Sequence, residues 1–542
     1  MDTEKIVIEN KFTLNIRSLF LIFACLGTIL LLGYTFYTSH IWEDFFITFR
    51  CSKNLADGNG LVYSIGEHVH AFTSPLGVLL PALTYILTGK TSYLAAIWGF
   101  RIIFCIPAFL GSIYFIVKLL GDNKDRSKEI LPLILLLYIF DVKSIMFTMN
   151  GMETGIMLFF LLSSIYFMHK GIEKHWIASG LLWGGLMWTR PDSCFYVAAI
   201  MIATFIFPSS QKDSSIKENN IVLNFFIMRK SQFFAIVKSA IVTTLIYLPW
   251  FLWAWWYYGS PVPNTVFAKS AISSFSFGDF FKHIFIYPTW AFMPVYPVLT
   301  KWPIFCSIIA SILSIFSCCY FLIAPRVDLL GRKLSLIFLI LSCYFATMPF
   351  PYPWYFPPLA VIGYIVTIRG LWFFTSYSPA LRRVMYGLVF IIVINSIFIF
   401  IATTYQISMQ QKLIETGLRM KIGEWIKDHK KSGDTVFLEP LGYIGYFSEA
   451  DMLDYPGLAT PKVTLLIKEK HCDYYSLIPE LKPDWIVSRL FRDKYLINMP
   501  YIQKNYSYIG CFSAIKQIKE SGYIPGRGYL EYDSAFVIYR KK

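Results

Sequence analysis

The stretch SLFLIFACLGTILLLGYTFYTSHIWEDFFITFR, residues 18–50, decides what kind of protein this is. Residues 18–37 are apolar over about twenty positions, which is long enough to cross the hydrocarbon core of a bilayer. Three basic residues precede this run: Lys5, Lys11 and Arg17. We interpret the run as an uncleaved first transmembrane helix rather than a signal peptide, because no convincing small-residue cleavage site follows it. Two adjacent acids, Glu43 and Asp44, come just after this helix.

The whole chain has the composition of a multi-span membrane protein. Its 542 residues are 56% hydrophobic and 18% aromatic, and only 15% are charged, which is too apolar for an ordinary soluble protein. The net charge of +15 comes largely from short segments between apolar runs, where basic residues orient helices, so no nucleic-acid binding is expected. The ten cysteines show no zinc-binding spacing. Cys472 and Cys511 could form a disulfide or remain a reduced pair.

Apolar runs of the required length give eleven candidate spans. They lie near residues 18–37, 95–120, 129–147, 152–170, 175–189, 193–208, 235–258, 303–324, 333–349, 354–372 and 383–404.

The distribution of Lys and Arg tests this count. With a cytoplasmic N-terminus, every inward connection is basic, as cytoplasmic loops require. These loops carry Lys124, Arg126 and Lys128; Lys170 and Lys174; Lys212, Lys217, Arg229 and Lys230; Arg326, Arg332 and Lys333; and Arg369, Arg382 and Arg383. The segments 38–94 and 259–302, and the tail after 404, are therefore expected to face outward.

Two outward segments have predicted structure of their own. In the first, apolar positions that include Phe45 and Phe49 predict a short interfacial helix after Asp44, ended by ADGNG. TSPLGVLLPALTYIL then predicts an interfacial or re-entrant stretch. In the tail, residues 404–542, DTVFLEP, DWIVSR and SAFVIYR predict strands and PKVTLLIKEK a helix. We expect a transmembrane domain over 1–403 and an extracytoplasmic α/β domain over 404–542.

The conspicuous polar residues near span ends all fall on the outer side. They are Glu43, Asp44, Glu153, Arg190, Asp192, Asn264, Lys269, and Tyr352, Trp354 and Tyr355 in PYPWYFPP. Each alone has a structural explanation: a solvated acid, a helix cap, a local ion pair or an interfacial aromatic belt. Together, charges from six segments near the hydrocarbon edge indicate a cavity with a function.

Several motifs resemble those of a known enzyme class. EDFFITFRCSKNLADGNGLVYSIGEHVHAFTSPLGVLL, NGMETG, RPD, PWFLWAWWYYGSPVPNT, YPWYFPPL and, in the tail, LGYIGYFSEADMLDYPGL together resemble the GT-C glycosyltransferases that use polyprenyl-phosphate sugars, and most closely the mycobacterial terminal arabinofuranosyltransferase family. The resemblance covers most of the chain. It departs from the family where Glu43 replaces a more usual Asp, and where His68 and His70 stand in place of Arg and Glu. The histidines suggest a donor or acceptor other than arabinose and arabinan.

The resemblance implies a GT-C fold in the bacterial cytoplasmic (inner) membrane, with the C-terminal domain periplasmic or extracellular. It also implies transfer of a sugar from a polyprenyl-phosphate donor to a cell-envelope glycan or lipid acceptor, as in lipopolysaccharide or polysaccharide biosynthesis, by general-base catalysis with inversion. Asp44 is favoured as base over Glu43, because neighbours on a helix point about 100° apart.

The remaining site residues have expected roles in binding. The donor phosphate is assigned to Arg190, Lys269 and Arg50, because cations stabilise its growing charge. Sugar, lipid or acceptor contacts are assigned to Glu153, Asp192, Asn264, Tyr352, Trp354 and Tyr355.

Two alternatives stay open at this stage. Paired carboxylates, joined by His68 and His70, could hold a divalent cation, although loop histidines more often face solvent. The chain could also be a lipid-linked sugar flippase or transporter, but transporters usually place binding groups near the midplane and in repeats. Here the helix interiors are almost uncharged and no repeat is evident.

Overall fold

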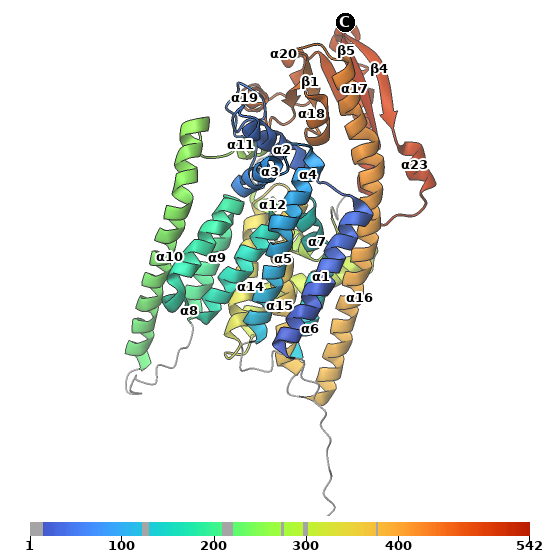
Figure 1. Ribbon diagram of the computed structural model, residues 1–542. Helices are drawn as coiled ribbons and strands as arrows, with labels where there is room; N and C mark the ends of the chain where they lie inside the picture. The colour runs from blue at the N-terminus through green and yellow to red at the C-terminus, as the bar shows by residue number, and fades with distance from the viewer. Residues whose placement is uncertain (1–14, 122–128, 209–220, 273–275, 296–301, 376–377) are drawn as a thin grey trace, which may run out of the picture.

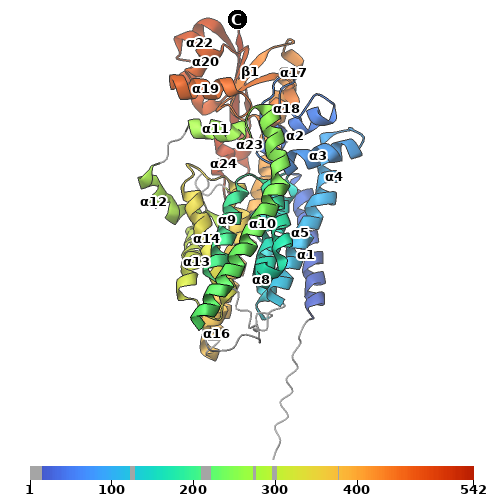
Figure 2. The ribbon, with the colours of Figure 1, turned by 90° about the vertical axis from the view of Figure 1, so that its left-hand side faces the viewer.

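A computed structural model describes residues 15–121, 129–208, 221–272, 276–295, 302–375 and 378–542. The molecule has two parts: a bundle of long, roughly parallel helices, and a smaller domain with a sheet at one end of the bundle (Figure 1). Short helices fill the space between them, among them α2 (Glu43–Ala56) and α11 (Asn264–Ala271) (Figure 2). The candidate functional site lies in this middle layer.

The bundle consists of helices whose lengths and apolar sequences suit a bilayer. They are α1 (Ile16–Thr38), α4 (Tyr93–Phe100), η1 (Arg101–Cys105), α5 (Ile106–Gly121), α6 (Leu131–Ile139), α7 (Val142–Met149), α8 (Thr154–Thr189), α9 (Ser193–Ile206), α10 (Ile221–Tyr258), α13 (Ile304–Ile323), α14 (Leu329–Ala346), η4 (Pro353–Tyr355), α15 (Phe356–Thr375) and α16 (Pro379–Gln410).

Within the described residues, eight helices are long and apolar enough to cross a membrane, or nine if α6 and α7, bent by 53°, form one span. Helix α8 adds a further pass because it turns back on itself. A straight helix of 36 residues would be about 54 Å long, yet Glu153 and Arg190 at its two ends form an ion pair of 3.1 Å. The reversal lies at Gly171, whose φ of 104° is not helical. With the two arms of α8 and the shorter α9, a described helix lies at each of the eleven predicted spans, and eight or nine of the helices have the length and composition of a membrane crossing.

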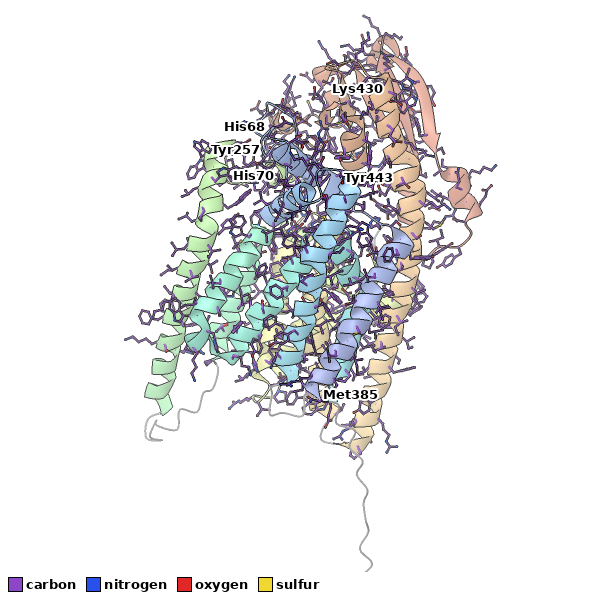
Figure 3. The ribbon with its side chains drawn as sticks, viewed as in Figure 1. His68, His70, Tyr257, Met385, Lys430 and Tyr443 are labelled. Carbon is purple, nitrogen blue, oxygen red and sulfur yellow. The ribbon has the colours of Figure 1, made fainter. Side chains whose placement is uncertain are left out.

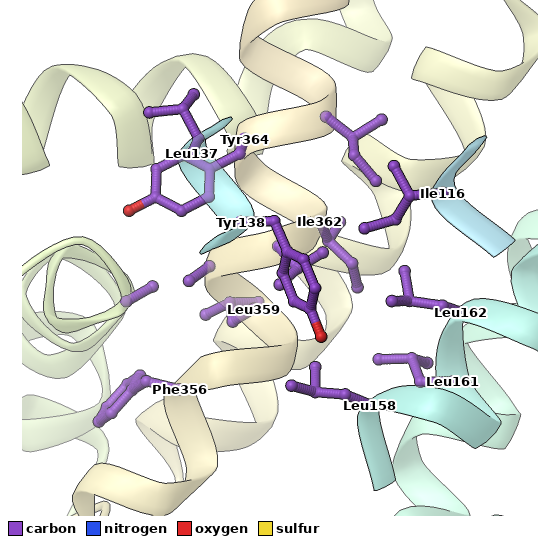
Figure 4. Close-up of a cluster of buried hydrophobic side chains, with 14 of the residues drawn as sticks. Ile116, Leu137, Tyr138, Leu158, Leu161, Leu162, Phe356, Leu359, Ile362 and Tyr364 are labelled. Atoms are coloured by element: carbon purple, nitrogen blue, oxygen red, sulfur yellow. The ribbon is translucent and has the colours of Figure 1, made fainter. Parts of the chain in front are cut away.

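Helix α15 is the centre of the bundle. Its apolar side chains, including Leu359 and Ile362, are buried against α5, α6 and α8 (Figure 4). The outer helices instead expose large apolar side chains, such as Ile29, Trp256 and Ile304. Because such a surface is stable only in lipid, the bundle is a polytopic membrane domain.

The first long segment between spans, residues 38–94, contains two short helices, α2 and α3 (Pro75–Leu87), at the positions of the two predicted stretches. Phe45 and Phe49 in α2 are fully buried. Helix α2 is covered by the C-terminal domain, whose helix α18 (Gly442–Ser448) packs on it, so it does not lie on a lipid surface. On the other side of the middle layer are α12 (Phe277–Ile286) and η3 (Tyr287–Ala291).

A single continuous helix joins the two parts of the molecule. Helix α16 continues through a π-helical segment, η5 (Gln411–Met420), into α17 (Lys421–His429). It begins at Pro379, passes Met385 near the far end of the bundle, and ends at His429, next to Lys430 beside the sheet (Figure 3). The span expected to end near 404 thus continues as a helix into the C-terminal domain.

The C-terminal domain contains a five-stranded sheet in the order β2-β1-β3-β5-β4. Strands β2 (Asp451–Asp454), β1 (Thr435–Leu438) and β3 (Trp485–Arg489) are parallel, whereas β5 (Ala535–Lys541) pairs antiparallel with β3 and β4 (Tyr506–Ser513). The expected strands β1, β3 and β5 and the expected helix α19 (Pro461–Lys470) are confirmed. The other helices are α20 (Leu477–Leu481), α21 (Leu490–Leu496), α22 (Pro500–Asn505), α23 (Ile515–Glu520) and α24 (Gly528–Tyr532). Cys472 and Cys511 are free thiols.

Candidate functional site

Three cavities meet at Lys269, between the bundle and the C-terminal domain. The inner cavity, of about 60 Å³, is lined by Asp44, Glu153 and Arg190 among others. The domain cavity, of about 430 Å³, lies between Glu43 and Asp44 on one side and residues of the C-terminal domain on the other. The lateral cavity, of about 580 Å³, lies between α12 and the end of α14. Lys269 lines all three, and Asp44 lines the inner and domain cavities.

The two adjacent acids are in different situations. Glu43 Oε1 accepts a 2.6 Å hydrogen bond from the main-chain N–H of Gly442, at the start of α18. No hydrogen bond or ion pair from the described residues engages the Asp44 carboxylate. Burial raises the pKa of Glu43 to about 7. Burial also raises the pKa of Asp44, and the nearby Lys269 ammonium opposes that shift. Glu43 therefore contacts the C-terminal domain through one carboxylate oxygen, whereas the Asp44 carboxylate has no such contact; both acids line the domain cavity, and Asp44 also lines the inner one.

Lys269 is presented to the site by α11 and by an aromatic pair. The rings of Tyr352 and Trp354 are stacked, with centroids 4.7 Å apart and planes at 8°. Lys269 Nζ lies 4.3 Å from the Tyr352 centroid and 6.0 Å from that of Trp354, within the range of a cation–π contact. Burial lowers the pKa of Lys269 to about 8. This ammonium is thus only moderately basic and sits where the cavities join.

Arg190 is held by contacts with three residues. Its Nη1 donates to Glu153 Oε1 at 3.1 Å, its Nε to Asp192 Oδ1 at 2.9 Å, and its Nη2 to the Tyr355 hydroxyl at 2.8 Å. The guanidinium also lies 4.5 Å from the Tyr355 ring centroid. The hairpin of α8 creates this cluster, because it returns residue 190 to the level of residue 153. A fixed cation at the wall of the inner cavity is suited to an anionic group.

Two predicted ligand residues instead join the two parts of the molecule. Arg50 donates to the carbonyls of Gly445 and Ala450, at 2.8 and 3.1 Å. Asn264 Nδ2 donates to the carbonyls of Gly457 and Leu458, at 2.8 and 3.0 Å. Neither side chain lines one of the three cavities.

The two histidines lie at the outer end of α10, near Tyr257 (Figure 3). His68 is exposed and stacks on Tyr257, with ring centroids 4.3 Å apart. His70 is buried and stacks on Tyr258, and burial lowers its pKa to about 3. Neither lines a cavity with the acids, and among the described residues no three His, Cys, Asp or Glu side chains are grouped to hold a metal ion.

A chain of buried ion pairs on the far wall of the domain cavity has no local sequence signal. Arg419 pairs with Glu415 at 2.8 Å and with Asp533 at 2.7 Å. Arg489 pairs with Asp533 at 2.5 Å and also with Glu439, which Arg492 contacts at 3.0 Å. These residues come from η5, β3, α21 and the connections after β1 and α24. The tail motif LGYIGYF contains Gly442, so the motif could have indicated a contact with the first loop, but the ion pairs could not be inferred.

The arrangement can perform a proton transfer next to an anion-binding group. Asp44 is an unengaged carboxylate within a cavity, and Lys269 and Arg190 are cations close enough to influence its ionisation. A base beside fixed cations suits attack by a hydroxyl group on a carbon bearing a phosphate leaving group.

Comparison with known proteins identifies the fold. Residues 403–539 match a family model described as a domain of unknown function (DUF8728). No curated protein matches the sequence. Two solved structures each have a TM-score of 0.55. One is the archaeal oligosaccharyltransferase AglB from Archaeoglobus fulgidus, in complex with an inhibitory peptide and a dolichol-phosphate, at 12% identity over 92% of this chain and 73% of that one. The other is ArnT from Cupriavidus metallidurans bound to undecaprenyl phosphate, at 10% identity over 96% and 97%.

These similarities extend over nearly the whole chain, so they include the bundle and the C-terminal domain together. The chain therefore has the polytopic GT-C fold that its motifs predict. At 10–12% identity, the likeness establishes the fold alone.

Proposed function

We propose that the protein is an integral-membrane glycosyltransferase that moves a sugar from a polyprenyl-phosphate donor to a glycan or lipid acceptor of the cell envelope. The observation that carries this proposal is the Asp44 carboxylate, which is unengaged by the described side chains and lines both the inner and the domain cavity. Two substrates can therefore approach one base from different sides.

The donor is assigned to the side of the lateral and inner cavities. The lateral cavity lies beside α12, whose Phe277, Phe281 and Phe285 are exposed at the level where the bundle ends, and an exposed aromatic helix of this kind suits the lipid interface. Lys269 joins the lateral and inner cavities and Arg190 lines the latter, so both cations can bind the phosphate. That AglB and ArnT were solved with dolichol-phosphate and undecaprenyl phosphate supports a lipid phosphate here too.

The reaction follows from this placement. Asp44 accepts the proton of an acceptor hydroxyl as its oxygen attacks the anomeric carbon, the bond from that carbon to the phosphate oxygen breaks, and the lipid phosphate leaves with the bonding electrons. Attack opposite the leaving group inverts the anomeric centre. Lys269 and Arg190 stabilise the charge that develops on the phosphate. Glu153 and Asp192 hold Arg190 in position, and Tyr352 and Trp354 hold Lys269.

The proposed setting is the outer face of a bacterial cytoplasmic membrane, with the N-terminus in the cytoplasm. The basic loops of the sequence support this orientation. All three cavities lie at the end of the bundle next to the C-terminal domain, which that orientation makes the outer end.

The test is transfer by the full chain in nanodiscs. The purified protein is incubated with a panel of radiolabelled polyprenyl-phosphate sugars and a cell-envelope glycan extract. We expect label from one donor to enter the glycan, with release of polyprenyl phosphate. Binding of a lipid-linked sugar without transfer or release from any donor would contradict the proposal and favour a flippase or transporter. A parallel flipping assay in proteoliposomes distinguishes these outcomes.

A further inference from the structure

We infer that the domain cavity binds the uncharged saccharide end of the acceptor, and that the C-terminal domain of unknown function supplies the wall that selects it. This inference rests on the proposed function and deepens it. It assigns acceptor specificity to the C-terminal domain, which lies outside the membrane bundle.

The position of the domain cavity makes it the acceptor side. It shares Asp44, Lys269 and Trp354 with the inner cavity, so a molecule in it can reach the base from the side opposite the lateral cavity. Its remaining wall consists of Glu439, Arg489 and Tyr532 with their neighbours in the C-terminal domain. At about 430 Å³, the cavity is within the range of small-molecule binding sites.

The charges on this wall are already balanced. Arg419 lies between Glu415 and Asp533, and Arg489 lies between Asp533 and Glu439. A phosphate or carboxylate entering the cavity would meet four lining carboxylates, those of Glu43, Asp44, Glu439 and Asp533, against three lining cations, Lys269, Arg419 and Arg489. An anionic acceptor is therefore disfavoured.

The same wall also carries a hydrogen-bond acceptor and an aromatic ring that can bind an uncharged sugar. Both arginine contacts of Glu439 go to Oε2, so its Oε1 has no hydrogen-bond partner in the described chain. Gln410 also lines the cavity, but its Oε1 is buried. The acceptor oxygen that this wall offers to a sugar hydroxyl is therefore Glu439 Oε1. The half-exposed ring of Tyr532 provides an apolar surface for the sugar ring.

The C-terminal domain is fixed against residues 41–50, which include Glu43 and Asp44, so this wall is preformed. Besides the bond from Gly442 to Glu43, the Tyr443 hydroxyl donates to the carbonyl of Ile41 at 3.1 Å. Arg50 binds the carbonyls of Gly445 and Ala450. These contacts place the saccharide wall at a set distance from Asp44, which favours selection by shape and charge.

The experiment compares matched neutral and anionic acceptors. Neutral oligosaccharides released from the cell-envelope glycan are divided, and half are oxidised at their primary hydroxyls to uronic acids. Initial rates are measured with the full chain in nanodiscs at a fixed, saturating donor concentration. We expect kcat/KM for the neutral pool to exceed that for the oxidised pool at least about tenfold, which corresponds to 1.4 kcal/mol.

Variants of the C-terminal wall link this selectivity to the cavity. Tyr532→Ala is expected to raise the acceptor KM about tenfold without changing the donor KM. Tyr523→Ala is its control, because Tyr523 is 75% exposed and lines none of the three cavities. Glu439→Gln leaves Arg489 less neutralised, so we expect the neutral-to-oxidised ratio to fall about fivefold or more. Glu480→Gln, in an exposed pair with Lys470, is the charge-matched control.

The outcomes separate this inference from the proposed function. If the wild type transfers sugar and releases polyprenyl phosphate but prefers the oxidised pool, the inference is wrong and the proposed function stands. The same conclusion follows if Tyr532→Ala and Glu439→Gln have the same acceptor KM and the same neutral-to-oxidised ratio as the wild type. If the wild type neither transfers sugar nor releases polyprenyl phosphate with any donor, the proposed function itself fails, and the inference fails with it.

Discussion

The main-chain N–H of Gly442 donates a hydrogen bond of 2.6 Å to the Glu43 carboxylate, across 399 positions of sequence. A Cβ at residue 442 would lie 2.0 Å from the Glu43 carbonyl oxygen and 2.8 Å from its carbonyl carbon. The two backbones can approach this closely only with glycine at this position. The acid pair of the first loop is thereby joined to the C-terminal domain.

Replacement of Gly442 is expected to weaken the contact between the C-terminal domain and the segment that carries Glu43. In Gly442→Ala the new methyl group meets backbone, which cannot rotate away, so we expect a cost of about 1–3 kcal/mol. Transfer activity should fall about tenfold or more, and limited proteolysis should cut residues 430–441 faster than in the wild type. The control is Gly510→Ala, because nothing lies within 4 Å of a Cβ there. Equal proteolysis of both variants would show that close packing at Gly442 does not hold the domain.

The two acids should respond differently to neutral replacement. Asp44→Asn removes the proposed base while nearly keeping its shape, so we expect kcat to fall about 10²–10⁴-fold. Glu43→Gln keeps a side-chain oxygen that can accept the Gly442 N–H, so a loss of tenfold or less is expected. Asp57→Asn is the control, since Asp57 lies in the same loop but pairs with Lys53 and Lys90. A larger loss in Glu43→Gln than in Asp44→Asn would exchange the two roles.

The pH dependence of transfer activity should reflect the ionisation of Lys269 and Asp44. Asp44 acts when ionised, so activity falls as pH drops through its pKa, which burial raises above the usual carboxyl range. Lys269 acts when protonated, so activity falls as pH rises through its pKa of about 8. The profile of kcat/KM against pH is therefore expected to be bell-shaped. In Lys269→Arg the alkaline limb should disappear below about pH 10, because a guanidinium keeps its proton. An unchanged alkaline limb in that variant would assign it to another group.

The Arg190 cluster should contribute strongly to stability. Arg190→Ala leaves Glu153 and Asp192 without their buried cation, and loss of one partner from a buried pair costs about 3–5 kcal/mol. We expect a clear fall in Tm in detergent, measured by intrinsic fluorescence. Lys516→Ala, which removes an exposed partner of Glu520 at 3.9 Å, should leave Tm nearly unchanged. Similar Tm values for the two variants would contradict this structural role.

Much of the membrane fold could be predicted from local sequence. Apolar runs of about twenty residues give the spans, and the basic loops give their alternation, because both depend on composition within a short window. The two spans that the sequence predicts near 152–170 and 175–189 are the two arms of the α8 hairpin, which reverses at Gly171. The extension of α16 past residue 404 was missed. In its π-helical continuation, the buried Arg419 pairs with Glu415 of the same segment and with Asp533 of the C-terminal domain, a partner more than a hundred positions away.

The sequence by itself determined that this is a membrane protein with eleven spans, and that acids, cations and aromatic residues gather at one end of them. It could not show that the two adjacent acids differ in their surroundings. One oxygen of Glu43 accepts the Gly442 N–H, and Asp44 lines the inner cavity as well as the domain cavity that both acids share. Nor could it show that Arg50 and Asn264 bind carbonyl groups of the C-terminal domain. Such contacts join residues hundreds of positions apart, and they depend on how the folded parts pack rather than on any local pattern.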